Sequence, residues 1–207
     1  MLFGVIVIAF LFQSVVCQSQ KTPCCMPERF QATLTDARTV SADVIVMFEL
    51  AIDYAQGLEG SAVYELNPRT GIKQETYRIV FDVPKHSVFT MAPNGTCWRT
   101  PYEVQFPSAR ERCLPASAQY ISGGNMGSIQ ALPWDSWRVN LGNITVTMAF
   151  GAQGCVPVVE GLKITGGPTP YEQTTFWSNF RHEITDHSLF YVPSSCVPSD
   201  SQIVVGR

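Results

Sequence analysis

The segment Asn143-Ile144-Thr145-Val146-Thr147-Met148-Ala149-Phe150 alternates polar and apolar residues with a period of two. Side chains of a β-strand point alternately to opposite faces, so this alternation predicts a strand with one apolar and one polar face. The apolar face carries Ile144, Val146, Met148 and Phe150. Most of the remaining chain also follows a period of two rather than 3.6, which predicts an all-β protein.

Other stretches extend this pattern. Residues 61–66 and 72–83 flank the loop 67–71 and are typical of a β-hairpin. In the second of these strands, Tyr77, Ile79 and Phe81 form an apolar face. Residues 43–52 are a longer apolar run, which indicates either a strand buried on both faces or a buried helix. Residues 154–158 and 172–184 are further strand-like stretches.

Proline and the scarcity of helix signals shape the expected architecture. Eleven of the 14 prolines occur from Pro84 onward, and we expect them to confine strands there to edges and short pieces. Few helix start or stop signals occur, so we expect few short helices. The residues therefore predict two packed antiparallel sheets or one curved sheet that forms a cup. The same residue types line filled cores and open pockets, so both remain open from the residues alone.

Composition excludes several classes of protein. The 207 residues include 14 Lys and Arg against 17 Asp and Glu, a net charge of −3, so no basic face is expected to bind nucleic acid. Charged residues make up only 15% and aromatic residues 11%, which argues against disorder and against a coiled coil.

The N-terminal residues are typical of a secretory signal peptide. Residues 2–12 are an unbroken apolar run of eleven, shorter than the roughly 20 that a membrane span needs. Val15 and Cys17 fit the −3 and −1 positions of a cleavage site. A bacterial lipobox at Cys17 is the alternative, but Val16 is bulkier than the small residue expected there. We therefore predict a signal peptide at 1–17, a single domain at 18–207 with no transmembrane segment, and secretion.

The cysteine count agrees with secretion. Cys17 aside, six cysteines remain: Cys24, Cys25, Cys97, Cys113, Cys155 and Cys196. An even number in a secreted chain predicts three disulfides, with 15 pairing patterns. Adjacent Cys24 and Cys25 are too close to pair with each other, which leaves 12 patterns. Zinc is the alternative, but the chain has no CxxC motif or Cys/His cluster. The sequons at Asn94 and Asn143 predict N-glycosylation.

No catalytic motif supports an enzyme. His182 and His187 resemble the zinc-protease motif HExxH, but they are five residues apart instead of four. The chain shows no nucleophile elbow, phosphate-binding loop, dinucleotide fingerprint or calcium loop. We therefore predict that the protein is not an enzyme.

The cysteines and their neighbours resemble those of the ependymin family over nearly the whole chain. The matching pieces are Cys24-Cys25-Met26-Pro27-Glu28-Arg29-Phe30, Cys97-Trp98, Phe106-Pro107 through Cys113-Leu114-Pro115, Gly127-Ser128-Ile129 before Trp134 and Trp137, Gly154-Cys155-Val156-Pro157-Val158, and Phe180 through Cys196. The order and spacing of these pieces carry the resemblance.

This resemblance implies a secreted, glycosylated protein in which two antiparallel β-sheets surround a deep apolar pocket. By matching positions it implies the pairs Cys24–Cys155 and Cys97–Cys196, which leaves Cys25–Cys113. Vertebrate members of the family carry a different third bridge. Family members are associated with lipids, calcium, homodimers and extracellular matrix, although no carboxylate here matches a calcium ligand of the family.

Two functions follow as hypotheses. The preferred one is a carrier of hydrophobic small molecules or lipids, for which the family resemblance implies calcium as a cofactor. Its expected pocket residues are Tyr77, Ile79, Phe81, Ile144, Val146, Met148 and Phe150. The alternative is a structural or adhesive glycoprotein that contacts extracellular-matrix components and has no carrier role.

Overall fold

A computed structural model describes residues 21–40, 43–101, 111–127, 132–166 and 170–198. The signal peptide predicted at 1–17 lies outside these residues, as do Phe106, Pro107, Ser128 and Ile129 of the family-like pieces. Among the described residues, no helix is long and apolar enough to cross a membrane.

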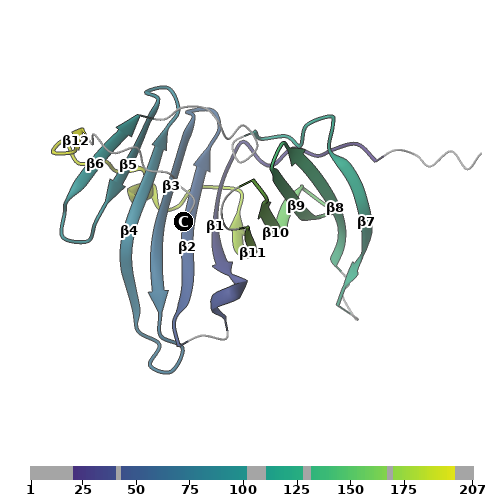
Figure 1. Ribbon diagram of the computed structural model, residues 1–207, viewed down its shortest axis with the longest axis horizontal. Helices are drawn as coiled ribbons and strands as arrows, with labels where there is room; N and C mark the ends of the chain where they lie inside the picture. Colours follow the sequence, from purple (N-terminus) through teal and green to yellow (C-terminus); the bar gives the residue numbers. More distant parts are fainter. Residues whose placement is uncertain (1–20, 41–42, 102–110, 128–131, 167–169, 199–207) are drawn as a thin grey trace, which may run out of the picture.

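The described residues form twelve strands and two short 3₁₀ helices (Figure 1). The strands are β1 (Arg29–Asp36), β2 (Ile45–Asp53), β3 (Leu58–Leu66), β4 (Lys73–Asp82), β5 (Ser87–Met91), β6 (Cys97–Pro101), β7 (Gln119–Met126), β8 (Leu132–Leu141), β9 (Ile144–Gly151), β10 (Val156–Ile164), β11 (Tyr171–Arg181) and β12 (Val197–Pro198). The 3₁₀ helices are η1 (Ala37–Thr39) and η2 (His187–Phe190). The all-β prediction is confirmed.

Hydrogen bonds join all twelve strands in one sheet, in the order β12-β6-β5-β4-β3-β2-β1-β11-β10-β9-β8-β7. All neighbours are antiparallel except β12 and β6, which are parallel. The sequence runs along most of the sheet by hairpins, whereas the β1–β11 and β12–β6 pairings join strands far apart in the chain. The structure therefore shows one sheet, and the arrangement of two sheets around a pocket is not confirmed.

The sheet bends so that its two parts share a core. One buried cluster combines Phe30 and Ile52 of β1 and β2 with Trp137 and Phe150 of β8 and β9. In the sheet order β2 and β8 are five neighbours apart. With about 4.8 Å between neighbouring strands, β2 and β8 would lie about 24 Å apart in a flat sheet, too far for their side chains to share one cluster. Figure 1 shows the bend between a first arm, β1–β6, and a second arm, β7–β11.

Strand register defines the two faces of this sheet, because directly paired residues point to the same side. The inner face is the one that carries Phe30, Ile52 and Met148, and it is the side on which the two arms meet. The outer face carries Ala51, Ala62 and Val80 on the first arm.

The C-terminal segment covers the outer face of the first arm. Leu189 of η2 and Ile184 pack on Ala51 and Ala62. At Gly60 a side chain would meet the backbone carbonyl of Leu189, so glycine allows this close contact. The outer face is thus closed by the protein's own chain.

Two predictions about local structure need correction. The long strands β8, β9, β10 and β11 follow Pro84, so the expectation that prolines confine strands there to edges and short pieces was wrong. Pro157 is tolerated inside β10 because it lies at an irregularity of the β9–β10 register, where a strand can lack an amide donor. Of the two readings of residues 43–52, the strand is right, since β2 pairs with β1 and β3.

Candidate functional site

The two sets of expected pocket residues lie on the same face of the sheet. On the first arm, Phe81 pairs with Glu59, which pairs with Ile52, so Tyr77, Ile79 and Phe81 belong to the inner face. On the second arm, Met148 pairs with Trp137 and with Glu160. Glu160 pairs with Thr175, which in turn pairs with Asp36 of β1. Met148 therefore points to the same side of the sheet as Asp36, which is the inner face of the first arm.

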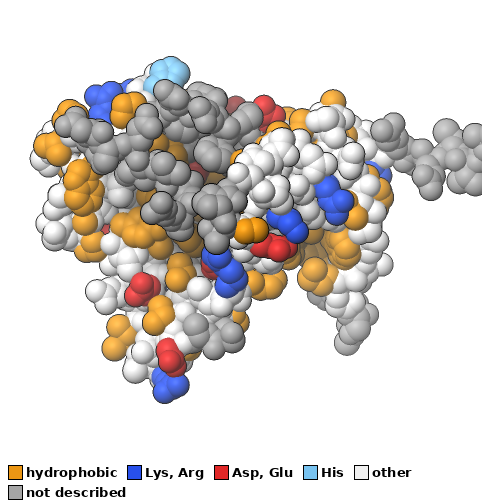
Figure 2. Space-filling view, in the orientation of Figure 1, with side chains coloured by type: hydrophobic (Ala, Val, Ile, Leu, Met, Phe, Trp, Pro, Cys, Tyr) orange, Lys and Arg blue, Asp and Glu red, His pale blue; other side chains and the backbone are white. Residues whose placement is uncertain are grey.

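The inner face is apolar but only partly covered. Of the expected pocket residues, Tyr77 is 38% exposed, Phe150 is buried, and the other five are half-buried. The apolar residues of the inner face that keep contact with solvent include Leu34, Phe48, Tyr77, Ile79, Phe81, Leu162 and Trp177. Figure 2 shows a hollow between the two arms, with hydrophobic side chains on its wall beside the second arm. Exposed contiguous apolar surface of this kind marks binding sites in monomeric proteins.

The outer face of the same strands carries ion pairs as well as apolar residues. On the outer face of β2–β4, Lys73 forms an ion pair with Glu49, and Arg78 pairs with Glu75 at 2.8 Å. The two faces therefore differ in how they are covered: the C-terminal segment packs on apolar residues of the outer face, whereas apolar residues of the inner face stay partly exposed.

A small pocket lies where the N-terminal segment crosses the inner face of the second arm. Its volume is about 30 Å³, and its lining residues are Cys24, Met26, Glu111, Arg112, Cys113, Leu114, Pro115, Val139, Val146, Met148 and Phe150. Three expected pocket residues thus line it, whereas Tyr77, Ile79, Phe81 and Ile144 do not. Such a volume admits one or two water molecules but is far below the roughly 300 Å³ of a ligand site. A ligand would have to occupy the open hollow, not this pocket.

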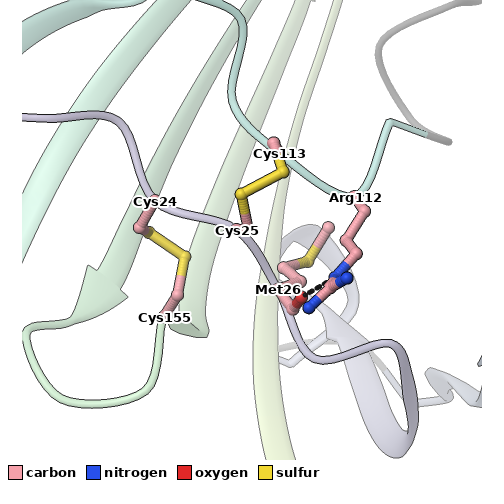
Figure 3. Close-up of a disulfide and its surroundings, with 6 residues drawn as sticks. All are labelled: Cys24, Cys25, Met26, Arg112, Cys113 and Cys155. Atoms are coloured by element: carbon pink, nitrogen blue, oxygen red, sulfur yellow. Dashed lines mark hydrogen bonds between the residues drawn. A yellow bond between two sulfur atoms is a disulfide. The ribbon is translucent and has the colours of Figure 1, made fainter.

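Disulfides hold this region together (Figure 3). The structure joins the cysteines as Cys24–Cys155, Cys25–Cys113 and Cys97–Cys196, the pairs that the family resemblance implies. The neighbours Cys24 and Cys25 reach different partners, one in the β9–β10 turn and one before β7.

Backbone and side-chain hydrogen bonds reinforce the same crossing. The amide of Met26 donates to the carbonyl oxygen of Arg112 at 2.8 Å, and the Arg112 Nε donates to the carbonyl oxygen of Met26, also at 2.8 Å. Figure 3 shows the second of these bonds beside the Cys25–Cys113 bridge. The N-terminal segment is thereby fixed to the second arm just before it enters β1 of the first.

Two carboxyl groups interrupt the apolar inner face. Burial of Glu160 raises its pKa above the usual value, and the nearby charge of Glu59 raises this pKa further. Trp177 lowers the pKa of Glu160, although its buried indole Nε1 has no hydrogen bond of ordinary geometry within the described part of the chain. The buried hydroxyl of Tyr54 also has no hydrogen-bond partner among the described residues. Burial raises the pKa of Tyr54, and the charge of Glu59 adds to this effect.

A third carboxyl group on this face, Asp36, forms an ion pair with an arginine. Its Oδ2 lies 2.6 Å from the Nη2 of Arg38 and also accepts a hydrogen bond from Gln173. Hydrogen bonds from Arg38 hold the pKa of Asp36 below its ordinary value. Hydrogen bonds from a cation thus favour the ionised form of Asp36, whereas burial disfavours the ionised form of Glu160 and raises its pKa.

Both predicted glycosylation sites are on the surface. Asn94 is exposed in the β5–β6 turn, where its Oδ1 accepts a hydrogen bond from the amide of Thr96. Asn143 is exposed in the β8–β9 turn, one residue before the strand on which the sequence analysis placed it. Either side chain is open to modification.

The residues weighed for metal binding do not come together. His182 and His187 are exposed, on either side of the turn that leads into η2. Within the described part of the chain, no three His, Cys, Asp or Glu side chains are placed to hold a metal ion. A calcium site therefore has no geometric support among these residues.

Sequence reasoning missed the polar groups of the inner face. Glu160 stands in the segment Val158-Val159-Glu160-Gly161-Leu162, where a charged residue between apolar ones could have indicated a buried carboxyl group. Trp177 was not singled out, because the alternation of residues 172–184 is weak.

Comparison with known proteins does not place this chain in a group. No protein-family model matches it, and no curated protein has a significantly similar sequence.

Proposed function

We propose that this protein is a secreted carrier of apolar small molecules, which bind in the hollow on the inner face of the bent sheet. One observation carries the proposal: apolar side chains from both arms stay partly exposed on that face, while the outer face of the first arm is covered. Transfer of an alkyl chain onto such a surface contributes about 0.8 kcal/mol per buried CH₂.

Secretion and family membership form part of the same proposal. Three disulfides are stable in oxidising compartments, and both sequons lie on exposed turns. The all-β fold and the cysteine pairs support membership of the ependymin family. A count of glycans and free thiols in protein collected from the medium of secreting eukaryotic cells tests this part.

The carrier function is tested by binding measurements on that secreted protein. Native mass spectrometry after mild extraction should show a bound lipid, and n-alkanols should displace a fluorescent apolar probe. Because 0.8 kcal/mol corresponds to about fourfold in affinity, each added CH₂ should tighten binding by about that factor until the hollow is filled. Empty protein that displaces no probe would contradict the carrier function.

A pair of variants locates the site. Ile79→Ser removes an apolar side chain from the inner face and should weaken probe binding several-fold. Arg78→Ser changes the neighbouring residue on the outer face and should leave probe binding unchanged. Equal effects of the two variants would place the ligand elsewhere.

A matrix glycoprotein is the second candidate, and the edge strand β7 favours it. All eight residues of Gln119–Met126 are exposed, and β7 ends the sheet, so its free backbone groups could pair with another strand. We propose a homodimer or a matrix partner at this edge. Sedimentation with and without extracellular matrix and chelator tests it, and a monomer that ignores matrix would count against it.

A further inference from the structure

The Cys25–Cys113 bridge differs from the other two disulfides in its exposure. Both of its cysteines are exposed, whereas each of the other bridges has one buried cysteine. The buried partners are Cys155, which is 7% exposed, and Cys97, which is 4% exposed. In thiol–disulfide exchange a thiolate must reach a sulfur of the bridge, so exposed bridges are the labile ones. We therefore expect a reductant to reach Cys25–Cys113 before the other two bridges.

This bridge fastens a strap, residues 111–118, to the N-terminal segment. Cys25 and Cys113 face each other in an isolated antiparallel bridge outside the twelve strands. The amide of Leu114 donates a 3.0 Å hydrogen bond to the N-terminal segment on one side of this pair, and the strap's two hydrogen bonds to Met26 lie on the other. Figure 3 shows the covalent link where the two segments cross. Without the disulfide, non-covalent contacts alone would join the strap to this segment.

The strap covers apolar residues on the inner face of the second arm. Its Leu114 and Ala118 pack against the core cluster that contains Trp137 and Phe150. Residues 111–115 line the pocket of about 30 Å³ together with four residues of β8 and β9, which are Val139, Val146, Met148 and Phe150. The strap thus occupies part of the face on which the proposed ligand binds.

The covered area continues into the hollow. Val146, which lines the pocket, pairs directly with Leu162, one of the apolar inner-face residues that keep contact with solvent. Directly paired residues point to the same side of a sheet. Release of the strap would therefore join the pocket to the hollow and add its apolar lining to the ligand surface. The Cys24–Cys155 bridge would still tie the N-terminal segment to the second arm.

We propose that Cys25–Cys113 is a redox latch on the ligand site: a dithiol reductant opens the bridge, the strap is released, and the covered part of the inner face becomes available to an apolar ligand. One thiolate of the dithiol attacks a sulfur of the bridge, the S–S bond breaks, and the other cysteine leaves as a thiolate that takes up a proton. The second thiol of the reductant then displaces the attacked cysteine. The two electrons and two protons of the dithiol end on the two cysteines, and the reductant becomes a disulfide. This inference rests on the proposed carrier function and adds its regulation.

Selective reduction tests the latch itself. The secreted, oxidised protein is treated under native conditions with dithiothreitol, samples are quenched with iodoacetamide over time, and labelled peptides are identified by mass spectrometry. We expect Cys25 and Cys113 to be labelled about tenfold faster than the four cysteines of the other bridges. Equal or faster labelling of another bridge would overturn the latch, whatever the protein binds.

The effect on the ligand site is measured by displacement of a neutral fluorescent probe with dodecanol. The double variant Cys25→Ser, Cys113→Ser should bind dodecanol about fourfold more tightly or better, since each further buried CH₂ contributes about that factor. The matched control is Cys97→Ser, Cys196→Ser, which removes a bridge of the first arm. It should leave dodecanol affinity within about twofold, because distant sites act independently.

The outcomes separate the latch from the carrier function. Equal dodecanol affinity of wild type and the folded latch variant, or equal tightening in the control variant, would overturn the latch and leave the carrier function standing. No displacement of the probe in any form of the protein would overturn both. If the latch variant fails to fold, wild-type protein that is reduced at Cys25–Cys113 and alkylated under native conditions gives the same measurement.

Discussion

Removal of the Cys24–Cys155 disulfide should destabilise the protein by an amount that the covalent topology sets. This bridge spans 131 residues, and the Cys25–Cys113 bridge begins one residue later and spans 88. While the Cys25–Cys113 bridge is intact, the Cys24–Cys155 bridge closes a loop of only 131 − 88 = 43 residues. For a closed loop of that size, the restriction of the unfolded chain contributes about 4 kcal/mol, against about 5 kcal/mol for 131 residues alone.

Because the two bridges share this loop, we expect removal of either one to lower the free energy of unfolding by the same amount. Replacement of Cys24 and Cys155 by Ala, or of Cys25 and Cys113 by Ala, opens the same 43-residue circuit, so each pair should cost about 4 kcal/mol. Removal of both bridges should cost about 9 kcal/mol, more than the sum of the two single losses, because the second bridge then closes its whole loop. Such a loss is comparable to the entire stability of a typical domain.

Urea denaturation of the oxidised proteins, followed by tryptophan fluorescence, measures these losses. Mass spectrometry with a thiol reagent confirms that the remaining bridges are formed. A loss below about 1 kcal/mol for either pair would refute the reasoning, because the bridge would then not restrict the unfolded chain. Clearly unequal losses for the two pairs would also refute it, since the shared circuit requires similar values.

Three further predictions concern packing, charge and modification. Gly60→Ala should destabilise the protein by about 1–3 kcal/mol in thermal unfolding, because the added methyl group meets the backbone of η2. Gly161→Ala, whose nearest contacts would lie at an ordinary 3.8 Å, is the control and should cost much less. Glu160 holds its proton more tightly when folded, so stability falls as the pH rises above the ordinary glutamate range. Glu160→Gln should therefore gain stability relative to wild type at pH 7 compared with pH 4, and parallel pH profiles would contradict this. In secreted protein, Asn94→Gln and Asn143→Gln should each remove the mass of one glycan, and an unchanged mass would show that the site is unmodified.

Local alternation predicted strands well where one face is apolar. The segment at residues 143–150 became β9, and the stretches around residues 67–71 became the β3–β4 hairpin. Alternation also assigned Tyr77 and Met148 each to an apolar strand face. The pattern could not show that these faces coincide, because this depends on the β1–β11 pairing between strands far apart in the chain.

The positions of prolines and charged residues predicted the structure less well, again because their effects depend on pairing between strands. The effect of Pro157 depends on an irregularity in the register, which is a property of two strands together. The effect of the Glu59 charge on the pKa of Glu160 likewise depends on strands that are four neighbours apart in the sheet. Neither is encoded in a window of neighbouring residues, so sequence reasoning found the elements but missed the polar part of the site.

The covalent connections explain how an apolar hollow can persist without a ligand. Exposed apolar surfaces on two arms would gain free energy by closing on each other. The N-terminal segment is tied to the second arm by Cys24–Cys155 and Cys25–Cys113, and after Met26 it continues as β1 of the first arm, which contains Phe30. Met26, Phe30 and Phe150 pack between the arms and hold them at a fixed spacing near the bend. The hollow beyond this core is therefore preorganised, and under the proposed function a ligand would not have to order the arms first.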